Sequence, residues 1–524
     1  MRKADCILKK NDEFEIDITD IGNDGEGIGR YDGMAFFIKG AVIGDRILAG
    51  ATKLKKTYGY ARLVKVLEPS PFRVMPACSI AGRCGGCQLQ PLSYEKQLEF
   101  KENKVRNDLI RLGAVNPERF SYEEKDTSDA GDSVIFHPII GMSSPANYRN
   151  KGQFPVGCDK AGKLVTGFYA GHSHSIIDTD SCMIQHPITD YVMRAVRAYM
   201  TECGISAYDE EKAAVYAEKN IKKNDLGLVR HVLTRVGFTT HELMVCVVIN
   251  GRKLPKWEKL QEKIEEAIES YNRICRTADT KELISGYVEN AGLDYRLASL
   301  SIDINTENTN VIMGNEVITL AGQPYIEDYI GDVKYRISPL SFYQVNPLQT
   351  KVLYSKALEY AALDSDDFVK KNGRKPVVWD LYCGIGTISL FLAQKAEKVF
   401  GVEIVPQAID DARMNAKING INNAEFFVGA AEEVLPAKYS EAPSMRADVI
   451  VVDPPRKGCD EKLLNTLVKM EPERIVYVSC DPATLSRDVK FLEANGYELK
   501  EVQPVDQFPY SVHVETVVLM SKVK

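Results

Sequence analysis

The sequence predicts an α/β fold with a small all-β barrel at the N-terminus, a central mixed α+β domain and a doubly wound C-terminal domain. Three observations lead to this prediction. Short β-like runs separated by glycine turns fill residues 13–67, three cysteines cluster between residues 78 and 87, and strands alternate with helices from about residue 335. Such alternation indicates a parallel sheet with crossover helices. A chain of 524 residues is also too long for one core.

Composition points to a cytoplasmic protein without a membrane span. No apolar run approaches the ~20 residues that a spanning helix needs, and the first residues lack the apolar core of a signal peptide. Twelve cysteines in a reducing compartment argue against a disulfide framework. The net charge of −7 does not by itself indicate nucleic-acid binding, but an average over a long chain can hide a basic face.

The N-terminal segment 13–67 contains such a basic stretch. Its short strands and glycine turns are typical of a small barrel. Residues 51–65 carry five positive charges, no negative charge and two interleaved tyrosines. A solvated strand face and a phosphate-tracking surface explain this pattern about equally well on charge alone. The charged residues are Lys53, Lys55, Lys56, Arg62 and Lys65.

A proline-rich linker follows the barrel and leads into the cysteine cluster. Cys78, Cys84 and Cys87 have the spacing x5 then x2, with glycines that let the chain wrap closely. Three thiols in one loop suit zinc or an iron–sulfur cluster, with a fourth ligand from elsewhere. Residues 92–113 then predict a helix that ends near Gly113.

The middle of the chain predicts mixed secondary structure. Residues 229–236 and 242–249 are apolar and β-branched, as expected of paired strands, and residues 254–274 predict an amphipathic helix. Residues 123–132 are acidic and small, which indicates a mobile loop.

A cofactor site is predicted where an apolar strand ends at Asp380 and a glycine turn follows. Glu403 closes the next strand, 19 residues after Gly384, where a carboxylate can bind ribose hydroxyls. A dinucleotide and S-adenosylmethionine both fit such a turn. Ser389 replaces the third glycine of the dinucleotide fingerprint, and this favours S-adenosylmethionine.

A later strand runs into the turn Asp453-Pro-Pro-Arg456. The turn is similar to that of methyltransferases acting on planar ring atoms, although an arginine stands where amino-methylating enzymes usually carry an aromatic residue. Asp453 is suited to contact the substrate or cofactor. A helix N-cap is the plainer role for such an aspartate, and both roles are compatible.

Two reactive groups lie near the C-terminus. Cys480 ends an apolar strand and Glu515 stands inside another. A thiolate that adds to carbon 6 of a pyrimidine activates carbon 5 for methylation, and a base must then remove the carbon-5 proton. Cys480 suits the first role, with Arg456 as the cation that favours its thiolate, and Glu515 suits the second. The plainer alternatives are an inert buried cysteine and a structural ion pair, and His513 is a weaker base.

At these motifs the sequence resembles the RNA uracil-5 methyltransferase family, which makes 5-methyluridine in ribosomal or transfer RNA. The resemblance implies a class I, Rossmann-like methyltransferase domain, with Cys480 as nucleophile and Glu515 as proton acceptor. It also implies that Gln344, Tyr382, Glu403 and Asp453 contact S-adenosylmethionine. The matching segments are 338–347, 380–386, 453–458, 478–488 and 508–515, with Tyr148-Arg149-Asn-Lys151 and Gly227–His231 in the central block.

The resemblance further implies a [4Fe-4S] cluster held by the cysteine triplet and Cys182, as in the ribosomal-RNA members. It favours 23S ribosomal RNA over transfer RNA as substrate, with a noncatalytic iron–sulfur RNA-binding protein as a different reading. A monomer is expected. Segments near 117–135 and 204–224 are not covered. The expected units are a TRAM-like RNA-binding barrel at 8–67, an iron–sulfur loop at 70–91, a helix packed on the catalytic domain at 92–113, a central RNA-binding domain at 136–332 and the methyltransferase domain at 335–524.

Overall fold

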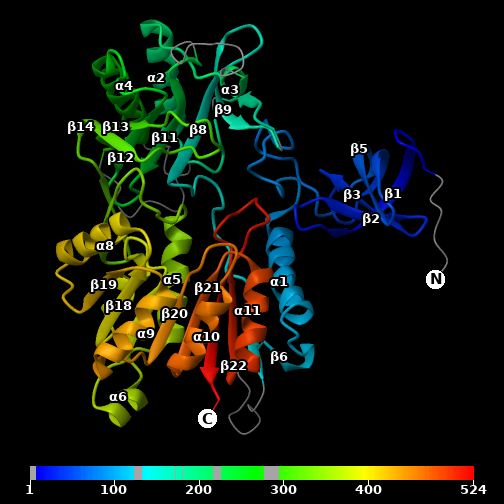
Figure 1. Ribbon diagram of the computed structural model, residues 1–524. Helices are drawn as coiled ribbons and strands as arrows, with labels where there is room; N and C mark the ends of the chain where they lie inside the picture. Colours follow the sequence, from blue (N-terminus) through cyan, green and yellow to red (C-terminus); the bar gives the residue numbers. More distant parts are fainter. Residues whose placement is uncertain are drawn as a thin grey trace.

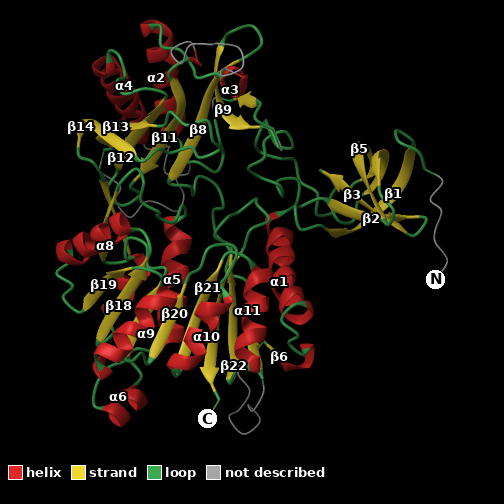
Figure 2. Cartoon of the chain, viewed as in Figure 1, coloured by secondary structure: helices red, strands yellow, loops and turns green. Residues whose placement is uncertain are grey.

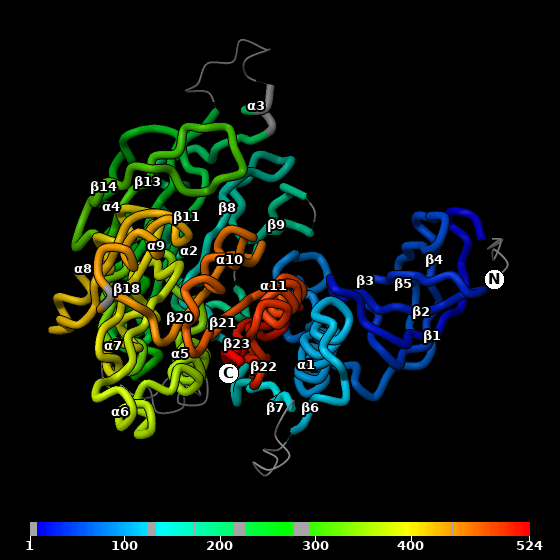
Figure 3. Tube along the Cα trace, turned by 60° about the horizontal axis from the view of Figure 1, so that its bottom comes forward, coloured from blue at the N-terminus to red at the C-terminus, as the bar shows by residue number. Residues whose placement is uncertain are grey.

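The described residues of the computed structural model form a closed barrel, a seven-stranded sheet, a nine-stranded sheet and a two-stranded hairpin, and the barrel stands to one side of the two larger sheets (Figures 1 and 3). Helices cover both of the larger sheets (Figure 2). Within the described part of the chain, no helix is long and apolar enough to cross a membrane. The structure describes residues 8–122, 133–171, 173–179, 181–215, 226–276 and 294–523.

The N-terminal barrel closes in the order β1-β2-β3-β5-β4. Alternate residues of β1 are buried and exposed, because one face of each strand fills the small barrel core. Gly25 lies in a turn at φ +84°, where a Cβ would stand 2.9 Å from Gln88 Cβ and 3.1 Å from Val512 Cγ1. The turn therefore docks closely against the rest of the protein. The strands are β1 (Glu13–Ile21), β2 (Gly27–Tyr31), β3 (Met34–Lys39), β4 (Arg46–Leu54) and β5 (Tyr58–Glu68).

Helix α1 (Tyr94–Arg111) leaves the barrel region and packs against the C-terminal sheet. Its contacts are with α11 (Pro482–Ala494) and β22 (Tyr497–Val505). Two short strands after it, β6 (Phe120–Ser121) and β7 (Val134–Phe136), extend the same sheet beyond β22. The C-terminal sheet thus includes two strands that lie far ahead of its other strands in the sequence.

The central domain is a seven-stranded sheet in the order β10-β9-β8-β11-β12-β13-β14. Helices α2 (Ile188–Cys203) and α4 (Trp257–Cys275) pack against each other and share one core with the sheet. The opposite face of β11 and β12 shares a core with the C-terminal domain. The remaining strands and helix are β8 (Lys151–Cys158), β9 (Leu164–Tyr169), β10 (Ile176–Asp178), α3 (Glu210–Val215), β11 (Val229–Val236), β12 (Glu242–Ile249), β13 (Arg296–Ile304) and β14 (Glu316–Gly322).

The C-terminal domain is a nine-stranded sheet in the order β19-β18-β17-β20-β21-β23-β22-β7-β6. Strands β17 to β21 are parallel, and β23 inserts antiparallel between β21 and β22. Apolar cores lie on both faces, as a doubly wound sheet requires. Its elements are β17 (Val377–Leu381), α7 (Thr387–Ala393), β18 (Lys398–Glu403), α8 (Pro406–Ile418), β19 (Ala424–Val428), α9 (Ala431–Glu441), β20 (Val449–Val452), α10 (Glu461–Met470), β21 (Arg474–Ser479) and β23 (Glu515–Lys522).

The predicted fold class is confirmed by this architecture. The boundaries at 136 and 332 differ in detail from the sheets. Residue 136 ends β7, and residue 332 is the turn of the hairpin formed by β15 (Ile326–Ile330) and β16 (Val333–Ile337), which precedes α5 (Pro347–Ala361) and α6 (Asp366–Asn372). A hairpin and a three-residue strand carry too weak a periodicity to assign them to a sheet from sequence. The expected loop at 123–132 and most of the segment after residue 215 lie outside the described residues.

Candidate active site

The carboxyl edge of the C-terminal sheet gathers the predicted reactive residues. Cys480 directly follows β21, and Glu515 is the first residue of β23. Because β23 runs antiparallel to β21, its first residue lies at the edge where β21 ends. Ser479 pairs with Thr516, so the next residues outward on the two strands are Cys480 and Glu515. The fold therefore sets the thiol and the carboxylate opposite each other.

The glycine turn after β17 is shaped for a close-lying ligand. Tyr382 has φ +71°, Gly384 φ +55° and Gly386 φ +82°, and α7 begins immediately afterwards. The Gly384 amide donates to Glu403 Oε2 over 3.3 Å, and the Val405 amide donates to Oε1 over 3.0 Å. The carboxylate that ends β18 is thus fixed beside the turn, where ribose hydroxyls bind in doubly wound folds.

Asp380 lies beneath this turn and is fully buried. Its Oδ2 accepts a 2.5 Å hydrogen bond from Ser389 Oγ, and its Oδ1 has no partner among the described residues. Burial raises the pKa of Asp380 to about 7, and the nearby Asp453 carboxylate raises it further while the Ser389 bond opposes the shift. Ser389 therefore has a structural reason to stand where a dinucleotide fold carries glycine.

Gln344 reaches the site on the loop that precedes α5. Asn346 caps α5 by accepting from the Gln349 amide, and the Gln344 carbonyl accepts from Asn150 Nδ2 over 3.0 Å. α5 packs against β20, β21 and β23. Burial raises the pKa of Tyr354 on α5, and so do Asp453 and Glu515, which shows that α5 covers the same crevice.

The same loop exposes one aromatic side chain that the sequence analysis did not single out. Phe342 is 72% exposed, although it stands between buried neighbours in the segment 338–347. An exposed phenylalanine beside a site for a planar ring is suited to base stacking. Its position two residues before Gln344 is the sequence signal that could have identified it.

The Cys480 thiol is held protonated in the free protein. Burial raises its pKa to about 12, and the Glu515 and Asp453 carboxylates contribute in the same direction, while Arg456 opposes them. Asp481 caps α11 by accepting from the Ala483 and Thr484 amides, so the thiol stands at a helix start. Reactivity therefore requires that a neighbouring group accept the thiol proton or that positive charge arrive nearby.

Asp453 and Glu515 influence each other. Burial raises the pKa of both carboxyl groups, the Asp453 charge raises that of Glu515 further, and Arg456 lowers it. Two like charges in one buried site resist simultaneous ionisation. The site is consequently able to hold a proton on one of the two carboxylates near neutral pH.

The turn that carries Arg456 is anchored by α11. Arg487 Nη2 donates to the Lys457 and Cys459 carbonyls over 3.0 and 2.9 Å, and pairs with Asp488 at 2.7 Å. Gly458 has φ +74°, and a Cβ there would meet Arg487 Nη2 at 2.6 Å. This packing holds the turn rigidly beside the thiol.

Arg456 also contacts His513, the residue that the sequence analysis ranked as the weaker base. Arg456 Nη2 lies 3.3 Å from His513 Nε2. Burial lowers the pKa of His513 to about 4, and Arg456 lowers it further, so the imidazole is neutral and accepts this hydrogen bond near neutral pH. His513 therefore orients the arginine.

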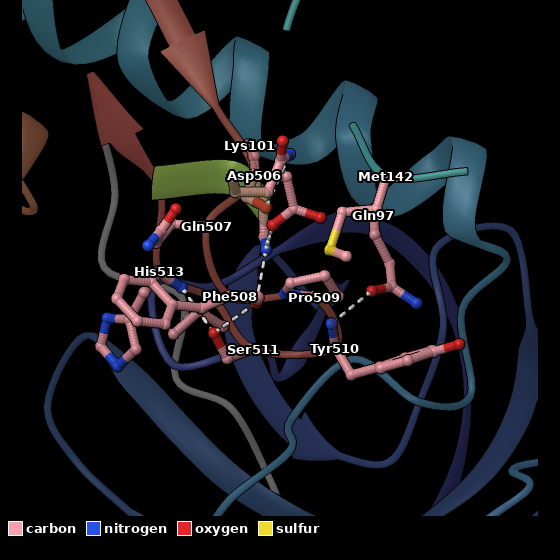
Figure 4. A network of polar contacts seen from close by, with 12 residues as sticks. Gln97, Lys101, Met142, Asp506, Gln507, Phe508, Pro509, Tyr510, Ser511 and His513 are labelled. Atoms are coloured by element: carbon pink, nitrogen blue, oxygen red, sulfur yellow. Dashed lines mark hydrogen bonds and ion pairs between the residues drawn. The ribbon is translucent and has the colours of Figure 1, made fainter. Parts of the chain in front are cut away.

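A buried ion pair fixes the loop that leads to Glu515 (Figure 4). Lys101 Nζ lies 2.5 Å from Asp506 Oδ1 and donates to the Phe508 carbonyl over 2.9 Å. Both charged side chains are fully buried. The Tyr510 amide donates to Gln97 Oε1 over 3.1 Å. α1 thus holds the loop before the candidate base. No local sequence pattern predicts this role, because the paired residues lie about 400 positions apart in the sequence.

The predicted cysteine ligands come from two segments that the fold joins. Cys84 forms a β-bridge with Ala170, and its Sγ accepts from the Gly86 amide over 3.4 Å. Burial raises the pKa of Cys87 to about 12, and the charges of Cys182, Cys84 and Cys78 raise it further, so the four thiols face one region.

The structure by itself does not establish a metal centre. Among the residues that it describes, no three histidine, cysteine, aspartate or glutamate side chains stand close enough to hold a metal ion. The expected cluster therefore stays a prediction. A four-iron cluster spaces its thiolates more widely than a single ion does, because irons and sulfides lie between them.

The comparisons with known proteins agree with this geometry. Residues 320–523 match the family model described as tRNA (uracil-5-)-methyltransferase, and residues 8–64 match the TRAM domain. The first match covers the crevice with Gln344, Cys480 and Glu515, and the second covers the barrel up to β5.

Full-length relatives extend the match to the central domain. The chain is 45% identical to an uncharacterized RNA methyltransferase of Halalkalibacterium halodurans, over 99% of both chains. It is 43% identical to one of Caldanaerobacter subterraneus, over 98% of this chain and 99% of the relative. Among solved structures, the Pyrococcus abyssi tRNA (uracil-54, C5)-methyltransferase in complex with S-adenosyl-L-homocysteine matches with a TM-score of 0.68 and 26% identity, over 97% of this chain and all of that one.

Proposed function

The chain belongs to the RNA uracil-5 methyltransferase family, and on that premise we propose that it methylates carbon 5 of a specific uridine in 23S ribosomal RNA through a covalent adduct on Cys480. Membership of this family supports the use of S-adenosylmethionine as methyl donor. The match of the barrel to the TRAM domain supports an RNA-binding role for the barrel. One observation supports the covalent route above all: the fold sets Cys480 and Glu515 opposite each other at the ends of β21 and β23.

The reaction consists of an addition, a methyl transfer and an elimination. The Cys480 thiol gives its proton to a neighbouring carboxylate, and the thiolate adds to carbon 6 of the uracil, so that the electron pair of the double bond between carbons 5 and 6 moves to carbon 5. Carbon 5 uses this pair to bond the methyl group, and the electron pair of the broken bond between sulfur and methyl stays on the departing S-adenosylhomocysteine. Glu515 removes the carbon-5 proton, and the returning electron pair breaks the bond between sulfur and carbon 6. Burial favours Glu515 as a base because it raises the pKa of the carboxyl group toward neutrality.

S-adenosylmethionine supplies the electrophilic methyl group when it is bound. Glu403 and Tyr382 frame the glycine turn, Asp453 stands one strand further along, and Gln344 borders the crevice from the loop before α5. We assign these four residues to its binding. The fit is supported by the orphaned Asp380 Oδ1 below the turn and by the three positive φ angles that bring the backbone close to a ligand.

Cys78, Cys84, Cys87 and Cys182 would hold the [4Fe-4S] cluster. The donor set suits it, since four cysteine thiolates hold such a cluster, and backbone amides already donate to the sulfurs of Cys84 and Cys182. The role that we assign is structural, because the cysteine segment continues directly into the Leu89 amide, which donates to the Tyr510 carbonyl over 2.9 Å. The cluster would thereby brace the loop before Glu515.

The choice of 23S ribosomal RNA rests on the cysteine set, which the resemblance associates with ribosomal-RNA members. Transfer RNA is the second candidate, and the likeness to the P. abyssi tRNA enzyme favours it. A noncatalytic RNA-binding protein is a third reading, which the paired Cys480 and Glu515 argue against. We further propose that the barrel and the central domain bind the RNA, and that the enzyme acts in the cytoplasm as a monomer.

Mass spectrometry of modified nucleosides tests this proposal. The purified protein, S-adenosylmethionine and in vitro transcripts of 23S ribosomal RNA and of transfer RNAs are incubated separately. We expect 5-methyluridine at one or a few positions of the 23S transcript. Methylation of transfer RNA alone would transfer the assignment to the second candidate, and no 5-methyluridine in any transcript would refute the activity.

The covalent step is tested with 5-fluorouridine-substituted transcripts. The wild-type protein forms an adduct that survives denaturing electrophoresis, and Cys480→Ala abolishes it. Cys158→Ala is the matched control, because Cys158 is an exposed cysteine at the end of β8. An adduct that persists in Cys480→Ala contradicts the nucleophile assignment. Glu515→Gln retains the adduct on ordinary RNA but releases no product, and normal turnover of this variant contradicts its role as the base.

A further inference from the structure

Three cations that the reaction does not use meet between the central sheet and the catalytic domain. Arg235 on β11 pairs directly with Lys151 on β8, so their side chains share one face of the sheet. Leu233, two residues before Arg235, belongs to the core shared with the catalytic domain. That face therefore looks toward the catalytic domain, and Arg149 joins the group by donating from Nε to the Lys151 carbonyl over 3.1 Å.

Within the described residues, this cationic group lacks a counter-charge. Arg235 is only 2% exposed, and it donates from Nη2 to the Ser341 carbonyl, but its Nε and Nη1 have no partner among the described residues. The buried Tyr343 hydroxyl beside it also lacks a partner in that part of the chain. Of the acidic groups that the structure describes, none forms an ion pair with Arg149, Lys151 or Arg235. Such a charge is costly to bury unless a ligand or partner neutralises it.

The protonation of Lys151 reflects the same imbalance. Burial lowers its pKa to about 7, and Arg235 and Arg149 lower it further. Burial also lowers the pKa of Arg235 to about 10, with a small opposing effect from the Tyr343 hydroxyl. A protein that held these residues only for structure would gain from a carboxylate here, and the described neighbours provide none.

The cationic group stands next to the catalytic crevice. Asn150, between Arg149 and Lys151, donates from Nδ2 to the Gln344 carbonyl over 3.0 Å and from its amide to the Val345 carbonyl over 2.8 Å. The loop that it holds leads into α5, which packs on the strands bearing Cys480 and Glu515. An anion bound by these cations would therefore lie beside the nucleotide that enters the crevice.

We propose that Arg149, Lys151 and Arg235 form a binding site for a backbone phosphate of the RNA, adjacent to the target uridine. Lys151 and Arg149 are partly exposed and contact the phosphate directly. Arg235 lies behind them as a fixed charge in a region of low dielectric, where its attraction is screened less than at the surface. A uridine that leaves its stack to reach Cys480 needs its backbone held in place, and cations on phosphates serve to position rather than to read sequence.

The observations favour an RNA phosphate over the other anion that enters this crevice, the carboxylate of S-adenosylmethionine. That carboxylate is accompanied by an ammonium group and a sulfonium on the same small molecule, which would stand against three further positive charges. A phosphodiester brings one negative charge and no positive one. The arginine forks and the lysine match its oxygens.

The inference rests on the proposed RNA substrate, and RNA affinity measured against salt concentration tests it. We compare wild-type protein with Lys151→Gln and Arg149→Gln, using the 23S transcript as the probe. Each variant is expected to weaken binding roughly tenfold, as the loss of a charge-assisted hydrogen bond predicts, and to flatten the plot of log affinity against log salt by about one unit. Lys151→Arg restores both. Lys163→Gln, an exposed lysine at the turn of the β8–β9 hairpin, is the matched control and changes neither.

Calorimetry with S-adenosylmethionine separates the two sources of anion. Unchanged affinity for S-adenosylmethionine in Lys151→Gln, together with a flattened salt plot for RNA, supports the site. Weakened binding of S-adenosylmethionine with an unchanged salt plot overturns it and assigns the cations to the carboxylate. A salt plot equal to that of Lys163→Gln also overturns it. Failure of the proposed function gives a different result, which is the absence of 5-methyluridine with wild-type protein. In that case the comparison of RNA affinities still decides whether the cations bind a phosphate.

Discussion

Lys101 and Arg235 are both buried cations at the borders of the catalytic domain, but their surroundings are opposite. Lys101 lies 2.5 Å from Asp506 and also donates to the Phe508 carbonyl. Arg235 donates to one carbonyl, and two of its nitrogen atoms have no partner among the described residues. Lys101 closes a network inside one domain, whereas Arg235 lies on the face where two domains meet.

The difference separates a structural charge from one that awaits a ligand. In a paired, hydrogen-bonded charge, the partner group of the protein offsets the free energy lost on burial. An unpaired buried charge destabilises the free protein, and a bound anion can offset that loss in the complex. On this argument Lys101 supports the geometry around Glu515, and Arg235 supports affinity for RNA.

The largest effect is expected from breaking the paired site. Lys101→Met leaves the Asp506 carboxylate buried and unpaired, which destabilises the protein by about 3–5 kcal/mol. The free energy of unfolding in urea measures this loss. The loop 506–514 is expected to loosen as well, so that kcat falls more than the affinity for RNA.

A double variant shows whether pairing is the cause. Lys101→Met with Asp506→Leu removes both charges and recovers most of the stability, because a buried apolar pair is about as stable as the ion pair. Equal instability of the single and the double variants would show that packing, and not charge, explains the loss.

The opposite result is expected at Arg235. Arg235→Met removes an unpaired charge and keeps most of the side-chain volume, so the free energy of unfolding stays within about 1 kcal/mol of the wild type or rises. Affinity for the RNA transcript falls at the same time. Destabilisation by several kcal/mol would show that Arg235, like Lys101, is a structural charge.

The fold, and the placement of Cys480 and Glu515 at one edge of the sheet, were accessible from sequence for a physical reason. The strand ending at Cys480, the glycine turn after Asp380 and the apolar strand at Glu515 are local patterns, and parallel-sheet topology brings their ends to one edge. The short strands β6 and β7 lack a periodic pattern of their own, so their place beside β22 was not predicted.

The supporting groups were not accessible in this way. Lys101 and Asp506 are separated by about 400 residues, and nothing in the local sequence of either indicates burial or pairing. Lys151 and Arg235 stand in ordinary strand patterns, and only their register shows that they share a face. Long-range pairing of charges is a property of the packed fold rather than of a sequence window.

The pH dependence of RNA binding sharpens the comparison at Lys151. Its pKa lies near 7 in the free protein because burial and two cations disfavour its charge. The charged fraction falls from about one half at pH 7 to about one tenth at pH 8, so Kd for the transcript rises about fivefold over that range. The free energy of unfolding shifts the other way: the folded state holds this proton less tightly than the unfolded chain, so the contribution of Lys151 to stability increases above pH 7.

Lys151→Arg is the control for this dependence. An arginine stays charged throughout, so its Kd is expected to be flat between pH 7 and pH 8. Fluorescence anisotropy with a labelled transcript at constant ionic strength measures both proteins. Parallel curves for the two proteins would show that another group titrates and that Lys151 does not contact the phosphate.

The smallest effect is expected on the barrel surface, where a paired and an unpaired cation can again be compared. Arg62 lies 3.4 Å from Glu13, whereas Lys53 has no acidic partner within the described residues. Both side chains are exposed, so water and salt screen their charges and each contributes little. Lys53→Gln is expected to weaken RNA binding about twofold, and Arg62→Gln less, because Glu13 already offsets its charge. The same anisotropy titration measures both variants. If Arg62→Gln weakened RNA binding more than Lys53→Gln does, RNA would have to displace Glu13 from the arginine. An ion pair in the free protein would then not identify structural cations on this surface.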